Sequence, residues 1–194
     1  NDLSSKDLMN IVQEFKELVL QETGLPFPNE PYQQLEKAIA AVFKSWNGKR
    51  AVDYRREFKI TQDMANGTAV NIVSMVFGNM GDRSCTGVIF TRSPATGEKK
   101  LYGEYLVNAQ GEDVVAGIRT PKPINNLERE FPESFNTIKK ISDRLEQHFK
   151  EVQDMEFTVE NGKFYMLQTR NGKMNASALV RTSIEMTNEG LLTK

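Results

Sequence analysis

Apolar residues recur at helical spacing in the N-terminal part of the chain. Ser4 or Ser5 can cap a first helix, and Gly24 lies beyond its last turn. A second helix is predicted to begin at Pro31, which suits a first helical turn, and to end at Asn47-Gly48. The apolar stripes of the two helices are Leu8, Ile11, Val12, Phe15, Leu18 and Val19, then Leu35, Ile39, Val42, Phe43 and Trp46.

Strand-like runs replace the helical spacing in the middle of the chain. Three runs are predicted as strands, at residues 69–78, 86–92 and 100–108. A further helix follows, with the stripe Phe135, Ile138, Ile141, Leu145, Phe149 and Val152, and a last one spans 172–190 with Ala176, Leu179, Val180 and Ile184 inward. The pattern predicts an α+β fold with a largely antiparallel sheet and helices packed against it.

Residues 154–170, "DMEFTVENGKFYMLQTR", form two alternating runs joined at Asn-Gly. Alternate residues of a strand share a face, so Asp154 and Glu156 point one way and Met155 the other. On the return strand, Gln168 and Arg170 belong to one set. Whether the carboxylates share a face with this second pair depends on the loop that joins the strands.

Two loops are possible for this hairpin. A two-residue Asn-Gly turn pairs Glu160 with Lys163 and sets Glu156 opposite Leu167, which mixes polar and aliphatic side chains. A three-residue loop with Gly162 in a bulge separates an apolar face from a polar face. The apolar face would then hold Met155, Phe157, Val159, Tyr165 and Leu167, and the polar face Asp154, Glu156, Gln168 and Arg170. Because burying one consistent apolar face is favourable, we predict the three-residue loop.

The shared polar face offers chemistry for a charged ligand. Mg²⁺ in proteins is typically held by one or two carboxylates together with phosphate oxygens, and Arg170 supplies a planar, permanently charged fork for phosphate. Glu112 and Asp113 follow a strand and Gln110-Gly111, where a ligand can approach the backbone closely. A surface strand with a compensating ion pair, and a solvated acidic turn, are the alternative interpretations.

Composition narrows the class of protein. The 194 residues are 39% hydrophobic and 26% charged, as in a globular protein, and no apolar run reaches membrane-spanning length. The 25 Lys and Arg residues balance 26 Asp and Glu residues, so no net charge favours nucleic acid or a membrane surface. The single cysteine, Cys85, excludes an internal disulfide and fits a reducing compartment. The chain opens at Asn1 without an initiator methionine, and we interpret it as a piece of a larger protein.

Three long blocks of the sequence resemble the nucleotide-binding domain of the pyruvate phosphate dikinase family. They are "MVFGNMGDRSCTGVIFTRSPATGE", "YGEYLVNAQGEDVVAGIRTP" and "MEFTVENGKFYMLQTRNGK", and "AIAAVFKSWNGKRAVDYRR" resembles the segment before them. Cys85 departs from the glycine expected at its position. The resemblance implies an ATP-grasp fold, in which two subdomains clamp MgATP. It also implies conversion of ATP, inorganic phosphate and pyruvate to AMP, pyrophosphate and phosphoenolpyruvate through a phosphohistidine.

The resemblance assigns expected roles to residues of this chain. Asp154, Glu156, Gln168 and Arg170 would bind the nucleotide, with Glu156 and Gln168 holding Mg²⁺. Arg170, Glu112 and Asp113 would be the catalytic residues: Arg170 would neutralise charge on the transferred group, and Glu112 and Asp113 would lie near the phosphates. The domain division it implies is a helical segment at 1–60, a sheet subdomain at 61–172 and a helix at 173–194 that leads to the phosphohistidine domain. Expected partners are ATP, phosphate and the phosphohistidine and pyruvate-binding domains of the same full-length chain, which would form a homodimer.

The family's phosphohistidine motif is absent from this sequence. The only histidine, His148, borders the helical stripe near Leu145 and Phe149, and we interpret it as a non-catalytic helix residue. The chain would therefore hold one wall of an ATP site and would not complete the reaction alone. Two alternatives stay open, a phosphoenolpyruvate synthase domain and a stand-alone nucleotide-binding module without catalysis. A cytoplasmic location is expected, or an organelle such as the chloroplast or glycosome.

Overall fold

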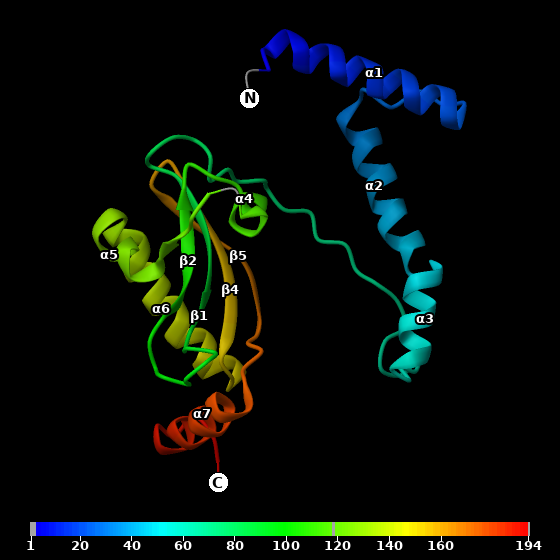
Figure 1. The fold of residues 1–194 in the computed structure, drawn as a ribbon. Coiled ribbons are helices and arrows are strands. Elements are labelled where there is room, and N and C mark those ends of the chain that lie inside the picture. The colour runs from blue at the N-terminus through cyan, green and yellow to red at the C-terminus, as the bar shows by residue number, and fades with distance from the viewer. Residues whose placement is uncertain (1–2, 118, 194) are drawn as a thin grey trace. The chain divides into compact units, whose positions relative to one another are not determined.

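The computed structural model describes residues 3–117 and 119–193 (Figure 1). The chain divides into two compact units, Asn1–Val73 and Ser74–Lys194, which are considered separately. Among the described residues, no helix is both long and apolar enough to cross a membrane.

The first unit consists of helices α1 (Ser5–Thr23), α2 (Pro31–Ser45) and α3 (Lys49–Glu57). Ser4 caps α1 reciprocally with Asp7, and Gly24 ends it in the left-handed conformation with φ 70°. The first two helices are therefore confirmed with the predicted boundaries. The third was not predicted, because its short sequence is too rich in charge to show a stripe.

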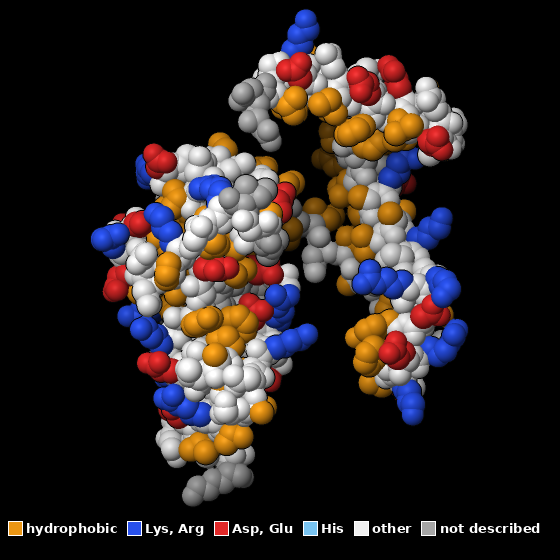
Figure 2. Space-filling model, viewed as in Figure 1, with side chains coloured by type: hydrophobic (Ala, Val, Ile, Leu, Met, Phe, Trp, Pro, Cys, Tyr) orange, Lys and Arg blue, Asp and Glu red, His pale blue; other side chains and the backbone are white. Residues whose placement is uncertain are grey.

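None of the described residues of the first unit is buried. Apolar side chains line one side of α1 (Figure 2), and Leu8, Val12, Phe15 and Leu18 are each more than half exposed. The strand predicted at residues 69–78 is wrong, because residues 69–77 pair with neither edge of the sheet. A β-propensity run without a neighbouring strand has no partner for its backbone hydrogen bonds.

The second unit is built on a five-stranded antiparallel sheet with strand order β3-β2-β1-β4-β5. The strands are β1 (Cys85–Phe90), β2 (Tyr102–Val107), β3 (Lys122–Pro123), β4 (Gln153–Glu160) and β5 (Lys163–Asn171). This confirms the α+β class with an antiparallel sheet.

Helices cover one face of this sheet. A 3₁₀ turn (Ile124–Asn126), α5 (Leu127–Glu130) and α6 (Pro132–Phe149) lie on one side, and α4 (Gly111–Ala116) lies at one end of the other (Figure 1). The main core sits between the sheet and α5 and α6, and its buried members are Cys85, Ile89, Tyr105, Ile124, Leu127, Phe135, Ile138, Met155, Phe157 and Val159. The helical stripe predicted for α6 is confirmed at Phe135 and Ile138, whereas Phe149 is 45% exposed.

The turn of the β4–β5 hairpin differs from the prediction. Asn161 and Gly162 have φ of 50° and 85°, and Glu160 pairs with Lys163, so the loop has two residues. The predicted three-residue loop is wrong. Asn-Gly tolerates two consecutive positive φ values, and such a turn matches the twist of the flanking strands. Backbone N–H groups of Asn161 and Gly162 also donate to Ser84 Oγ (3.0 Å) and to the carbonyl of Arg83 (2.8 Å).

A bulge further along β5 changes the register. Phe157 pairs with Met166, but Glu156 pairs with Gln168, so Leu167 is an extra residue in β5. Phe164 and Met166 consequently pack against the core, in place of the predicted Tyr165 and Leu167. Below the bulge, Asp154 pairs with Arg170. The shared polar face is present, and the bulge at Leu167, rather than the loop, produces it.

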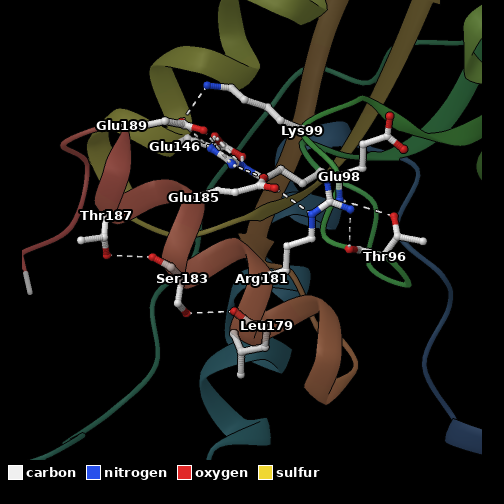
Figure 3. Close-up of polar contacts among 11 residues, drawn as sticks. Thr96, Glu98, Lys99, Glu146, Leu179, Arg181, Ser183, Glu185, Thr187 and Glu189 are labelled. Atoms are coloured by element: carbon white, nitrogen blue, oxygen red, sulfur yellow. Dashed lines mark hydrogen bonds and ion pairs between the residues drawn. The ribbon is translucent and has the colours of Figure 1, made fainter.

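Helix α7 (Ala176–Asn188) closes the second unit. Its buried residues are Ala178, Thr182 and Met186, whereas Leu179, Val180 and Ile184 are more than half exposed, so the predicted inward face is wrong. Lys99, Glu146, Glu185 and Glu189 gather at its C-terminal end (Figure 3), around the fully buried guanidinium of Arg92. Ion pairing to Arg92 therefore sets which face of α7 turns inward.

Candidate functional site

The sheet face opposite α5 and α6 carries the predicted site residues. The register aligns side chains across four strands in three rows on this face, which we call the open face. The rows are Tyr102, Phe90, Asp154 and Arg170; then Glu104, Val88, Glu156 and Gln168; then Leu106, Thr86, Thr158 and Tyr165. Since antiparallel partners lie side by side, residues of one row are neighbours.

Arg170 joins two carboxylates on the open face. Its Nε donates to Asp154 Oδ2 over 2.7 Å, and its Nη2 lies 3.7 Å from Glu156 Oε1. The hydrogen bond to Asp154 raises the pKa of Arg170 above its usual value. The Asp154 side chain is only 12% exposed, whereas the Arg170 side chain is 58% exposed. The cation is therefore held from one side and is accessible to an anion from the other.

A cavity of about 380 Å³ opens on the same face. Glu156 and Glu112 both line it, so α4 and the hairpin, distant in sequence, contribute carboxylates to one space. Its remaining lining combines Thr86, Thr158 and Gln110 with apolar residues from β1, β5 and α4 and with residues 75–78. Asp154, Gln168 and Arg170 lie on the open face outside this lining.

Glu112 and Asp113 lie in the first turn of α4, where a plain turn was expected. Asp113 Oδ2 accepts a 2.8 Å hydrogen bond from the backbone N–H of Gln110, which caps the helix. Leu106, Ala109 and Val114 form a small core that holds α4 on the sheet. The structure thus separates the two neighbours, with Glu112 facing the cavity and Asp113 occupied at least partly in capping.

The donor set suits a Mg²⁺ ion that takes part of its coordination from a ligand. Glu156 and Gln168 are direct cross-strand partners and offer a carboxylate and an amide oxygen. No group of three or more His, Cys, Asp or Glu arranged to hold a metal occurs among the described residues. Two oxygen donors such as Glu156 and Gln168 are compatible with Mg²⁺, which usually keeps waters and phosphate oxygens as further ligands.

Sequence reasoning did not find several residues of this face. Thr86 and Thr158 lie within 3.2 Å of each other through their hydroxyls, and Thr86 Oγ1 also donates to the carbonyl of Phe157 (3.1 Å). Extending the alternation from the hairpin to "CTGVIF" would have found Thr86 and Val88. Leu167 could not be found in this way, because its place depends on a bulge.

Comparison with known proteins gives the family. The sequence model described as "Pyruvate phosphate dikinase, AMP/ATP-binding domain" matches residues 20–132 and 127–191. The chain is 58% identical over 195 residues to pyruvate, phosphate dikinase of Entamoeba histolytica and 50% identical over 194 residues to that of Clostridium symbiosum. It is 51% identical over 191 residues to pyruvate, phosphate dikinase 1 of Zea mays, whose name calls it chloroplastic.

These matches cover 98–100% of this chain but 20–22% of each relative. The chain thus spans about a fifth of the length of the relatives. It belongs to the pyruvate phosphate dikinase family and corresponds to the AMP/ATP-binding domain. The family predicted from the sequence is confirmed.

Proposed function

We propose that this chain forms one wall of an ATP-grasp nucleotide site that binds MgATP within a full-length pyruvate phosphate dikinase. The observation that carries the proposal is the placement of Arg170 between Asp154 and Glu156 on the open face beside the cavity that Glu112 lines. An exposed guanidinium with fixed carboxylate partners is oriented to meet a polyphosphate.

Each residue has a part in the proposed chemistry. Glu156 and Gln168 hold Mg²⁺, which when bound neutralises and orients phosphate oxygens. Asp154 fixes the guanidinium of Arg170, which binds the polyphosphate and offsets charge that develops on the transferred group. Glu112, and the oxygen of Asp113 left free by capping, lie near the phosphates. Positioning and electrostatic support are what phosphoryl transfer mostly needs.

The overall reaction belongs to the full-length protein. ATP, phosphate and pyruvate would give AMP, pyrophosphate and phosphoenolpyruvate, through a histidine in another domain of the same chain. The full-length protein is proposed to be a homodimer, in the cytoplasm or an organelle. A requirement for inorganic phosphate, with release of pyrophosphate, would separate this activity from that of a phosphoenolpyruvate synthase.

Titration of the full-length protein with a β,γ-imido analogue of ATP in Mg²⁺ tests the proposal. Arg170→Ala should weaken binding by about ten- to a hundredfold, because a charge-assisted hydrogen bond is lost. Arg129→Ala is the matched control, since that side chain is 83% exposed on α5, which covers the opposite face. Unchanged affinity in Arg170→Ala, or no binding by the wild type, would contradict the proposal.

A further inference from the structure

Leu167, the extra residue in β5, is not needed to align the polar residues of the open face. From Lys163 to Met166, β5 pairs regularly with β4, and from Gln168 to Asn171 it pairs regularly again. A strand without Leu167 would still pair Gln168 with Glu156 and Arg170 with Asp154. In a strand that contains Leu167, the bulge is what keeps the polar residues aligned, but the alignment itself does not need this residue.

The bulge places two consecutive side chains on one face. Tyr165 lies opposite Thr158 and Gln168 opposite Glu156, so Leu167, between them, turns to the open face as well. Its presence in the cavity lining beside Thr158 and Glu156 agrees with this. A regular strand would alternate faces and could not present an apolar and a polar side chain in succession.

The pairing on the opposite face holds the bulge in place. Thr169 Oγ1 donates to Gln153 Oε1 and Gln153 Nε2 donates to Asn171 Oδ1, both over 3.0 Å. Above the bulge, the ring of Phe164 stacks on that of Phe157 with centroids 5.8 Å apart. Since both flanking registers are fixed by such contacts, Leu167 cannot turn away without breaking one of them.

The side chain of Leu167 is apolar but is not part of a buried core. Its side chain is 51% exposed and lies outside the two buried cores of the sheet. With Met75, Val76 and Val88 it forms an apolar part of a cavity that also contains Glu156 and Glu112. An apolar wall next to charged groups suits a ligand with one uncharged end and one highly charged end.

We propose that Leu167 is a specificity-determining residue that contacts the base-and-ribose portion of the nucleotide, while Gln168 and Arg170 serve its phosphates. This inference rests on the proposed function. The bulge thus lets one strand serve both ends of the ligand, and it makes the site prefer a nucleotide over a free polyphosphate.

Two probes separate the ends of the ligand in the full-length protein with Mg²⁺. AMP carries the base and ribose, and inorganic pyrophosphate carries neither. Leu167→Ala should weaken AMP binding by about tenfold, the size expected for truncating an apolar contact, and should leave pyrophosphate binding within about twofold. Deletion of Leu167 should have the same selective effect, and Leu167→Met should restore AMP binding.

Leu179→Ala is the matched control, because Leu179 is 52% exposed and lies on α7. Unchanged AMP affinity in Leu167→Ala, or equal weakening of AMP and pyrophosphate, would overturn the inference while leaving the proposed function intact. If Arg170→Ala leaves pyrophosphate binding unchanged, the proposed role of Arg170 fails instead. A wild-type protein that binds neither probe overturns both.

Discussion

Arg92 and Glu146 form an ion pair that is almost wholly removed from solvent. Arg92 Nη2 lies 2.9 Å from Glu146 Oε2, and the two side chains are 0% and 5% exposed. Nη1 and Nη2 of the same guanidinium donate to Glu189 over 3.1 and 2.8 Å. Burial alone would lower the pKa of Arg92, but the hydrogen bonds to both carboxylates outweigh it and raise the pKa. This cluster joins the segment that follows β1, helix α6 and the C-terminal cap of α7.

Replacing Arg92 should therefore destabilise the folded protein strongly. In Arg92→Met, Glu146 stays buried without a cation, which should lower the free energy of unfolding by about 3–5 kcal/mol. Arg92→Met/Glu146→Met should recover much of the loss, since the buried carboxylate is then absent and Glu189 keeps its ion pair with Lys99. Urea unfolding of the protein measures both. Arg181→Met is the control, because its pair with Glu185 is at the surface and should contribute less than about 1 kcal/mol. An equally small effect for Arg92→Met would contradict the prediction.

The free energy of unfolding should fall at acidic pH, in part because Glu189 becomes protonated. The hydrogen bond from Arg92 lowers the pKa of Glu189, with a smaller contribution from Lys99. A carboxyl whose pKa is lowered by folding stabilises the protein above its unfolded pKa, about 4.3, and the contribution is lost as pH falls through the folded value. Below about pH 4.3, the urea midpoint of the wild type should therefore drop more steeply than that of Glu189→Gln. Parallel pH profiles would argue against this linkage.

Glu112 and Asp113 should respond differently to removal of charge. Asp113→Ala removes the cap on Gln110 N–H and should destabilise α4 by about 1 kcal/mol, seen as faster amide exchange there. Glu112→Ala should leave exchange in α4 unchanged, and the proposed function predicts that it alters MgATP affinity. Identical exchange in the two variants would show that the cap contributes nothing.

Cys85 should be unreactive in the folded protein. The side chain is completely buried in the main core, and burial raises the pKa of its thiol to about 12. Because the thiolate is the reactive form, a maleimide should label Cys85 at pH 7 only after denaturation. Rapid labelling of the native protein would contradict the burial of this residue. Tyr105, buried in the same core, likewise has a raised pKa, mainly through burial.

Much of the fold could be predicted from local patterns. Helices α1 and α2 were predicted because their apolar spacing and end signals, such as Ser4 and Gly24, act within a few residues. The prediction of a strand at 69–78 was wrong, because a strand needs a neighbouring strand to pair with, and the local sequence does not show whether one is present. The prediction of the inward face of α7 was wrong for a similar reason. The orientation of this helix depends on ion pairing to Arg92, which is distant in the sequence.

The β4–β5 hairpin separates what the local sequence determines from what depends on the tertiary structure. Alternation by itself determined that Asp154 and Glu156 share one face of β4 and that Gln168 and Arg170 share one face of β5. Only the tertiary structure decided that these faces coincide. Asn161-Gly162 fixed a two-residue turn, packing of Phe164 and Met166 fixed the upper register, and the bulge at Leu167 corrected the lower one. Alternation is a property of the backbone, whereas the position of a bulge depends on which side chains the rest of the core can bury.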